Sequence, residues 1–278
     1  DGKEFWNSAD IYHFIGKDIV YHHYLFLPAM RLGLDKEYKL PDYIPTRGHL
    51  TLQAKKISKS RNWYIGLKQF LEYYPADYLR FYLVSINPYS QDDLNFDWDD
   101  FTTRINSELI GNLGNFVNRA LGFTKKAFDG KIPEIDSFDE KDSEAEEKIK
   151  SLASDVGSLM EQNHLDRALK KIMEFSSHFN QYFQHKEPWK KGPGTANCVF
   201  LSVNAVRSLA IAIFPFMPES AQKIWDQLGL DGNVNSISWS DISNLGISSG
   251  HTLGEPSPLF ARVESSDIEE YKKQLSPS

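Results

Sequence analysis

The spacing of hydrophobic residues along this chain of 278 residues changes near Trp63. Before that position, the apolar run of residues 10–30 predicts a strand, a tight turn and a buried helix, and the alternating residues 49–53 predict a second short strand. After it, apolar residues recur at helical spacing, so the pattern predicts a mainly α protein with a small α/β portion near its N-terminal end. The predicted helices span residues 65–74, 76–85, 98–128, 143–162, 164–186 and 195–228, and Pro215 and Pro218 interrupt the last of them.

Composition narrows the class of protein. With 41% hydrophobic and 25% charged residues, and no apolar run close to the roughly 18 residues that cross a membrane, the sequence predicts a soluble cytoplasmic protein with no membrane segment. A net charge of -7 argues against indiscriminate nucleic-acid binding but leaves room for a local basic face. Cys198 is the single cysteine, so we expect neither an intrachain disulfide nor a cysteine-based zinc site.

A compact basic and hydroxyl-bearing cluster, Lys56-Ile57-Ser58-Lys59-Ser60, follows the second predicted strand. Two ammonium groups three residues apart, interleaved with two hydroxyls, can form charge-assisted hydrogen bonds to a pyrophosphate as negative charge builds on the leaving group. Segments rich in lysine and serine are also common in solvated loops. The cluster alone therefore does not decide between a phosphate-binding loop and an ordinary surface loop.

Gly16 and Asp18 lie where the first predicted strand turns into the helix that follows. A carboxylate in the first turn of a helix favours the positive end of the helix dipole. In nucleotide-binding α/β domains, a carboxylate at the same place can accept hydrogen bonds from a ribose. A helix cap and a ligand contact are therefore equally compatible with Asp18.

The long predicted helix carries asparagines at positions 106, 112, 115 and 118, although asparagine is a poor helix former. Asn115 and Arg119 share one face and offer amide and guanidinium groups that can read the edges of unstacked bases. The alternative is that these residues bridge neighbouring helices, as buried amides often do. Trp189, between Pro188 and Lys190, is either a core residue or a platform on which a base stacks.

Together these motifs resemble the second half of a class I aminoacyl-tRNA synthetase, and the methionyl-tRNA synthetase family fits best. The family's loop is Lys-Met-Ser-Lys-Ser, and here Ile57 stands in place of the Met, an apolar exchange of similar volume. The His-Ile-Gly-His motif of the class is absent from the sequence, so we expect a fragment that does not catalyse the family's reaction on its own. The resemblance rests on residues 14–19, 48–51, 56–60, 76–83, 97–101, 115–119, 188–189 and 215–218.

The fold implied by the resemblance is mainly α. It joins the C-terminal remnant of a Rossmann-like α/β catalytic domain to a helix-bundle anticodon-binding domain. In the family the C-terminal tail packs back on the body, and Leu259 and Phe260 are the expected anchors. The implied regions are residues 1–40 from the nucleotide-binding domain, 41–85 as a connecting α/β region with the basic loop, 86–240 as the helical domain, and 241–278 as the tail.

The activity implied by the resemblance has two steps. Methionine attacks the α-phosphate of ATP to give methionyl-adenylate, and the terminal adenosine of a methionine tRNA then takes the acyl group. ATP with Mg²⁺, L-methionine and the tRNA are the implied substrates, no metal site is implied within the chain, and the oligomeric state stays open. The implied site residues are Lys56, Ser58, Lys59 and Ser60 for catalysis; Gly16, Asp18, Lys56 and Lys59 for ATP; Ile19 and His23 for methionine, beside the departing residue His22; and Asn115, Arg119 and Trp189 for the anticodon.

Two further interpretations stay open. One is the same region of a sibling synthetase for leucine, valine, isoleucine or cysteine, which methionine-dependent stabilisation of the complete enzyme would separate from the first. The other is a non-catalytic tRNA-binding or adaptor protein. Loss of Asn115, Arg119 or Trp189 would favour an adaptor, and all three residues are present.

Overall fold

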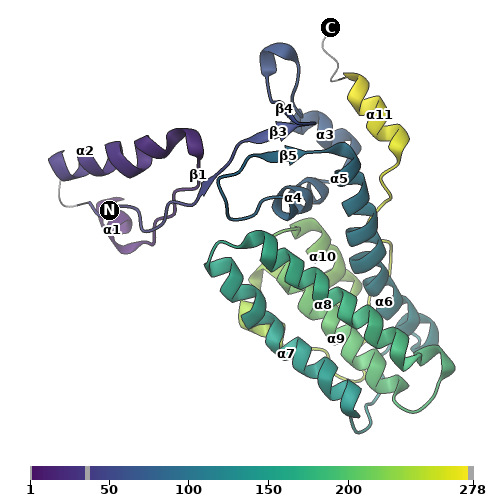
Figure 1. Cartoon of the computed structure of the whole chain (residues 1–278). Helices are drawn as coiled ribbons and strands as arrows, with labels where there is room; N and C mark the ends of the chain where they lie inside the picture. The colour runs from purple at the N-terminus through teal and green to yellow at the C-terminus, as the bar shows by residue number, and fades with distance from the viewer. Residues whose placement is uncertain (1, 35–37, 275–278) are drawn as a thin grey trace.

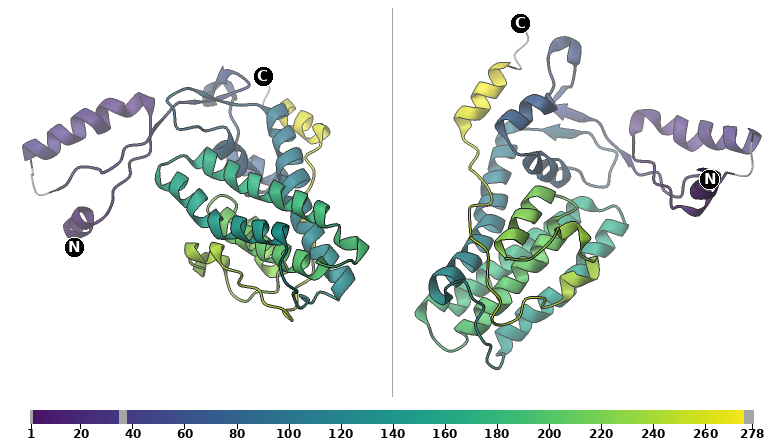
Figure 2. Two further views of the ribbon diagram at one scale, coloured as in Figure 1. Left: turned by 60° about the horizontal axis from the view of Figure 1, so that its bottom comes forward. Right: turned by 180° about the vertical axis from the view of Figure 1, so that it is seen from behind.

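The computed structural model describes residues 2–34 and 38–274. An N-terminal arm projects away from a small sheet, the sheet adjoins a helical bundle, and the C-terminal segment returns along the bundle toward the sheet (Figures 1 and 2). All strands within the described part of the chain lie before residue 97, and helices make up most of the rest. The mainly α fold with an N-terminal α/β portion is therefore confirmed.

The arm consists of short helices around one short strand. The helix predicted in the arm is present, but its predicted burial is wrong, because its large apolar side chains face solvent and no described element covers them. These side chains are Tyr21, Tyr24, Leu25, Phe26, Met30 and Leu32. Along the arm lie α1 (Gly2–Ser8), β1 (Ile15–Gly16), a 3-10 turn (Lys17–Ile19), a π-helical segment (His22–Phe26) and α2 (Leu27–Leu34).

Two small sheets connect the arm to the bundle. β1 pairs in parallel with β2 (Thr46–Arg47). In the second sheet, β3 (Leu50–Leu52) lies between β4 (Lys55–Lys56), which is antiparallel to it, and β5 (Leu94–Phe96), which is parallel. The strand predicted at residues 49–53 is confirmed as β3. β5 was not predicted, because three alternating residues are too few to stand out as a strand.

The helices predicted after Trp63 are confirmed, with ends that differ by a few residues. Aromatic side chains from several of them pack against β5: the ring centroids of Tyr82 and Phe96 lie 4.9 Å apart, and those of Phe96 and Phe101 lie 5.7 Å apart. The predicted helix 98–128 is one continuous helix with a π-helical middle. The segments are α3 (Leu67–Tyr73), α4 (Ala76–Ser85), α5 (Trp98–Arg104), the π-helical stretch (Ile105–Gly114) and α6 (Asn115–Phe128).

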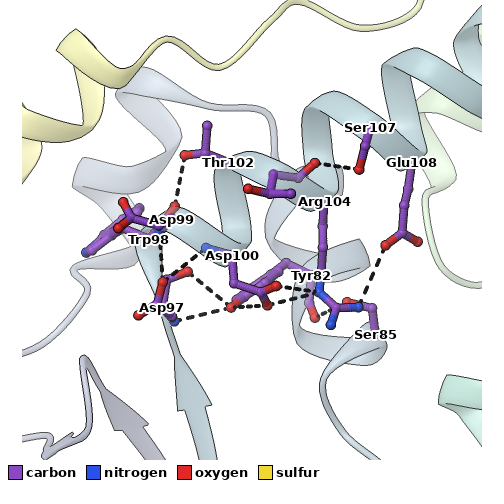
Figure 3. Close-up of polar contacts among 11 residues, drawn as sticks. Tyr82, Ser85, Asp97, Trp98, Asp99, Asp100, Thr102, Arg104, Ser107 and Glu108 are labelled. Atoms are coloured by element: carbon purple, nitrogen blue, oxygen red, sulfur yellow. Dashed lines mark hydrogen bonds and ion pairs between the residues drawn. The ribbon is translucent and has the colours of Figure 1, made fainter.

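Side-chain hydrogen bonds fix the start of this long helix (Figure 3). The Asp97 carboxylate accepts from two backbone N–H groups in the first turn of α5, so Asp97 caps this helix. The Tyr82 hydroxyl of α4 donates to Asp100 at 3.0 Å, and Arg104 Nε donates to the same carboxylate at 2.9 Å. Burial raises the pKa of Glu108, whose carboxylate lies 3.7 Å from Arg104. These contacts fasten α4 to the long helix.

The remaining helices complete the bundle around α9. The helix α9 (Thr195–Ile213) is long and apolar enough to cross a membrane, contrary to the expectation that the sequence holds no such apolar run. Its most apolar window is 94% buried within the protein, as the core helix of a bundle requires. The run was not recognised in the sequence because the polar residues Asn197, Asn204 and Arg207 interrupt it. The helices are α7 (Glu140–Glu161), α8 (Leu165–Lys186), α9 (Thr195–Ile213) and α10 (Pro218–Gln227).

Arg47 connects the first sheet to the bundle. Its Nη2 donates to the carbonyl of Asn163 at 3.1 Å, in the turn between α7 and α8. Its guanidinium lies 4.3 Å from the centroid of the Tyr89 ring, and Tyr89 meets His164 edge-on with centroids 5.5 Å apart. The strand β2 is therefore held against the residue that precedes α8.

The C-terminal segment packs along the long helix. The Tyr78 hydroxyl donates to the Ala261 carbonyl at 2.7 Å and accepts from the Ala261 N–H at 2.8 Å. Asn106 forms two hydrogen bonds with the backbone of Val263, at 2.9 and 3.0 Å. Leu259 and Phe260 both pack against the core. This segment also contains 3-10 turns at Val234–Ser236 and Trp239–Ser243, and it leads into α11 (Ser265–Gln274), which the sequence pattern did not predict.

Candidate functional site

The basic loop begins as a tight hairpin. Gln53 and Ala54 both adopt positive φ, at 50° and 59°, and turn β3 into β4. Lys56 ends β4 and is exposed, while Ile57 is partly buried and packs on the core. Ile57 therefore fills an anchoring position, which is consistent with an apolar exchange for Met. The lysine on its N-terminal side is left in solvent.

The second half of the loop is a short 3-10 turn closed by backbone pairing. Ser58 and Trp63 exchange backbone hydrogen bonds of 2.8 and 2.9 Å, and the exposed Lys59 and Ser60 lie between them. The Ser58 and Ser60 hydroxyls are 3.1 Å apart. The structure thus brings both hydroxyls together and leaves the Lys59 ammonium at the surface. Among residues 2–34 and 38–274, neither lysine of the motif forms an ion pair.

Trp63 supports this loop from the strand side. Its indole Nε1 donates to the Leu52 carbonyl at 3.0 Å, so the ring is tied to β3. The Lys55 ammonium lies 5.1 Å from the ring centroid. Cation–π contact therefore occupies Lys55 and separates it in role from the two lysines of the motif.

Asp18 lies where the arm meets the second sheet. Its Oδ1 is 3.3 Å from His49 Nε2, and hydrogen bonding to His49 is the main reason that its pKa is lowered. A Cβ at Gly16 would lie 2.6 Å from the same carboxylate oxygen, so only glycine leaves the carboxylate its place. Lys17 pairs with Asp93 at 2.8 Å beside them. Sequence reasoning missed His49 and Asp93 as partners, because they come from other segments of the chain.

The residues implied for the amino-acid pocket lie on the arm. Ile19 and His23 are both partly buried, although His23 falls in the π-helical segment rather than in a regular helix. His23 Nδ1 lies 3.0 Å from His13 Nδ1, and the ring centroids are 5.0 Å apart at nearly a right angle. Burial, followed by His23 and Arg31, lowers the pKa of His13. The two imidazoles therefore contact each other at this position, while His22 faces solvent.

Arg119 and Trp189 come together where α6 passes the C-terminal end of α8, and Asn115 lies one helical turn before Arg119 on α6. Arg119 Nη2 donates to Gln184 Oε1 at 3.0 Å, and its guanidinium lies 5.1 Å from the Phe183 ring and 6.0 Å from the Trp189 ring. Asn115 is exposed, and Trp189 is 42% exposed. An amide, a cation and an aromatic face thus share one accessible surface, which we call the Trp189 surface.

Two other asparagines of the long helix, Asn106 and Asn112, bridge neighbouring elements, as the alternative interpretation predicts. Asn112 Nδ2 donates to the Met173 carbonyl at 2.9 Å, and Asn106 holds the C-terminal segment. Asn115 combines both roles, since its Nδ2 donates to Asn180 Oδ1 at 3.0 Å from an exposed position. A bridging contact therefore does not remove Asn115 from the accessible surface.

No group of three or more His, Cys, Asp or Glu side chains arranged to hold a metal ion occurs in the described part of the chain. Cys198 is buried in α9, and burial raises the pKa of its thiol to about 12. Its sulfur is therefore protonated at neutral pH and is not a thiolate ligand.

Two family models match the chain. The model described as tRNA synthetases class I (M) matches residues 1–121, and the anticodon binding domain of methionyl tRNA ligase matches residues 132–278. The second match covers more than half of the sequence.

Curated relatives and solved structures give the same result. A methionine–tRNA ligase of Pyrococcus abyssi is 40% identical over 96% of this chain, and one of Methanopyrus kandleri is 39% identical over 99%. The chain spans only 38% and 41% of those two proteins. Methionyl-tRNA synthetase of Mycobacterium tuberculosis, in complex with methionyl-adenylate, superposes with a TM-score of 0.82 at 29% identity, covering 93% of this chain and 51% of that one.

Proposed function

Because this chain belongs to the methionyl-tRNA synthetase family of class I, we propose that it supplies the ATP loop and the anticodon-reading domain of a methionine–tRNA ligase. The complete protein would form methionyl-adenylate from L-methionine and ATP and transfer the methionyl group to its tRNA in the cytoplasm. The family assignment removes the sibling synthetases for leucine, valine, isoleucine and cysteine. A non-catalytic adaptor becomes one outcome of the tests below.

The Trp189 surface carries the proposal for RNA binding. Single-stranded bases stack on exposed aromatic faces for about 1–3 kcal/mol each. Here the exposed indole has the Arg119 guanidinium 6.0 Å from its centroid. The accessible amide of Asn115 lies one helical turn before Arg119 on α6. Stacking on Trp189 would hold an unpaired base, while Arg119 and Asn115 would bond to base edges or phosphate. This combination suits a single-stranded anticodon loop better than a duplex.

The basic loop carries the proposal for ATP chemistry. Lys56 and Lys59 are exposed and free of ion pairs within the described residues, so both ammonium groups are available to the β- and γ-phosphates of Mg²⁺-bound ATP. Charge on the leaving pyrophosphate grows in the transition state, and fixed cations there lower the barrier. Ser58 and Ser60, whose hydroxyls are 3.1 Å apart, would orient the same phosphates.

The remaining site residues would complete the ligand contacts from the arm. Gly16 and Asp18 would hold the adenosine, with His49 keeping the Asp18 carboxylate ionised by a hydrogen bond that lowers its pKa. Ile19 and His23 would line the methionine pocket. We assign the exposed apolar face of α2 and the π-helical segment to packing against the part of the catalytic domain that the relatives have outside the matched region. The chain by itself would therefore catalyse neither step.

Binding of this chain to RNA stem-loops tests the proposal. We expect a stem-loop with the anticodon CAU to bind at least tenfold more tightly than one with that triplet changed, a difference of about 1.4 kcal/mol at fixed salt. Trp189→Ala should weaken CAU binding about 5- to 150-fold, as loss of one stacked base predicts. Phe5→Ala, which removes a still more exposed aromatic ring from the arm, is the control and should change nothing.

Equal binding of both stem-loops by the unaltered chain, together with no effect of Trp189→Ala, would favour the adaptor interpretation. The ATP loop is tested separately in the complete enzyme. There, Lys59→Ala should slow adenylate formation far more than it weakens methionine binding. Equal effects on both would remove the transition-state role of Lys59.

A further inference from the structure

The short turn that carries Trp189 has an unusual backbone. Glu187 and Lys191 adopt left-handed conformations, with φ of 42° and 53°, on either side of the 3-10 turn formed by Pro188–Lys190. Gly194 follows with φ of 81°, immediately before α9. Non-glycine residues in this region of φ and ψ are disfavoured, so the surrounding structure must hold them there.

A cluster of ion pairs, which we call the node, adjoins this turn; it is formed by Lys186, Asp139 and Asp142. The Lys186 ammonium is 2.7 Å from an oxygen of Asp139 and 2.7 Å from an oxygen of Asp142. The side chains of Lys186 and Asp142 are only 8% and 1% exposed. Asp142 also accepts from the Tyr182 hydroxyl at 2.7 Å and from Asn197 Nδ2 at 3.0 Å. The node therefore joins the starts of α7 and α9 to the end of α8.

This node contacts the Trp189 turn at both of its ends. Lys186 is the last residue of α8, and its backbone leads straight into Glu187. At the other end, a Cβ placed on Gly194 would lie 3.2 Å from the Lys186 ammonium, so the ammonium lies against the backbone that closes the turn. The residue Lys186 therefore adjoins the first end of the turn through its backbone and the second end through its side chain.

The stability of the bundle does not by itself account for this node. Taking two charges out of water costs several kcal/mol per ion, and well-packed apolar residues of similar volume often serve as well or better. Burial works against the charged form of Lys186, yet the hydrogen bonds that its ammonium donates to Asp139 and Asp142 raise its pKa. The charges are thus retained at a place where they adjoin the Trp189 turn.

We propose that Lys186 and Asp142 are positioning residues for RNA recognition: their buried ion pair holds the Trp189 turn so that the indole faces the bound base. The inference rests on the proposed anticodon-reading function. Neither residue touches the RNA, because Asp142 is buried and the Lys186 ammonium is turned inward onto two carboxylates. Their effect is transmitted through the backbone of the turn to Trp189.

Four variants of this chain test the proposal against simpler roles. Lys186→Met removes the buried ammonium and leaves Asp142 without its counter-charge. The double variant Lys186→Met/Asp142→Asn removes both charges, and the new amide can donate to the Tyr182 hydroxyl. Lys190→Met is the matched control, since it deletes an exposed ammonium from the same turn, where the side chain is 65% exposed. Trp189→Ala reports on stacking itself.

Each variant is measured in three ways: its midpoint of urea unfolding, its affinity for the CAU stem-loop at several salt concentrations, and the fluorescence of a stem-loop carrying 2-aminopurine in the anticodon. Stacking on an indole quenches 2-aminopurine. We expect Lys186→Met to be destabilised, to bind CAU at least tenfold more weakly and to lose quenching. The double variant should recover stability but neither affinity nor quenching. Only Lys190→Met should reduce the slope of log affinity against log salt, because only an exposed cation displaces counterions from the RNA.

A double variant that recovers affinity and quenching along with stability would overturn the inference, because the node would then be only structural. So would Lys186→Met with unchanged quenching. Failure of the proposed function looks different: Trp189→Ala would then leave affinity unchanged, whatever the Lys186 variants do.

Discussion

Asp77 gives the sharpest test of how the two regions of the chain are joined. This residue of α4 is 1% exposed, and its Oδ2 accepts from both the backbone N–H and the hydroxyl of Ser220, each at 2.7 Å. Ser220 is the third residue of α10, whose own cap residue, Met217, supplies no side-chain hydrogen bond. A carboxylate from one helix therefore caps another that lies far away in the sequence.

The expected cost of removing this cap follows from the contacts. Hydrogen bonds to a charged group contribute about 1.5–3 kcal/mol each, and a carboxylate at a partly buried helix N-terminus adds up to about 2 kcal/mol. Part of this is offset because Asp77→Ala no longer buries a carboxylate. We expect Asp77→Ala to lower the free energy of unfolding by about 3–5 kcal/mol. Asp77→Asn keeps an acceptor for Ser220 and should cost about 1–2 kcal/mol.

Urea unfolding followed by circular dichroism measures both values. Glu219→Ala is the control, since it removes an exposed carboxylate from the same helix N-terminus and should cost only about 0.3–1 kcal/mol. If Asp77→Ala and Glu219→Ala cost the same, the buried cap contributes nothing beyond helix-dipole electrostatics. If Asp77→Asn costs as much as Asp77→Ala, the hydrogen bonds are not the source of the stability.

Three further predictions concern other parts of the molecule. Burial lowers the pKa of His178 in the folded state, so its protonation favours unfolding, and its contribution to stability is present above about pH 6.5 and lost as the pH falls below it. The melting temperature should therefore fall less between pH 7.5 and 5.5 in His178→Gln than in the unaltered chain. Cys198, with its thiol buried and its pKa raised to about 12, should resist iodoacetamide at pH 8 until urea unfolds the protein, and rapid alkylation of the folded chain would contradict this. A Cβ at Gly48 would lie 1.9 Å from the Asp92 carbonyl oxygen, so Gly48→Ala should cost at least about 1–3 kcal/mol in urea unfolding. Gly33→Ala on α2, with open space around its Cβ, should cost nothing.

The helical part of the fold was predictable because burial on one side imposes a repeat on the sequence. α4, for example, occupies the predicted residues 76–85. The arm helix was misjudged for a related reason. An apolar run records that a surface will be covered, but it does not say whether the covering segment belongs to the same chain. In residues 2–34 and 38–274, nothing covers it.

Site residues were predictable only where they are neighbours along one element. Asn115 and Arg119 share a helix face, so their spacing placed them together. The contact of Asp18 with His49, the stacking of Lys55 on Trp63 and the burial of Lys186 against α7 depend on tertiary packing. Lys186 in particular was indistinguishable in the sequence from its exposed neighbours Lys190 and Lys191.

The length of α8 gives the Arg47 contact a mechanical meaning. The helix has 22 residues, so at about 1.5 Å per residue it is a rod about 33 Å long. Arg47 of β2 donates a hydrogen bond to the turn before the first residue of α8, and the Trp189 turn follows the last residue of α8. Because packed helices move as stiff bodies, a tilt of α8 by about 3° about its C-terminal end would shift its N-terminal end by about 1.7 Å. The strand β2 therefore contacts one end of a stiff helix whose other end leads into the Trp189 turn.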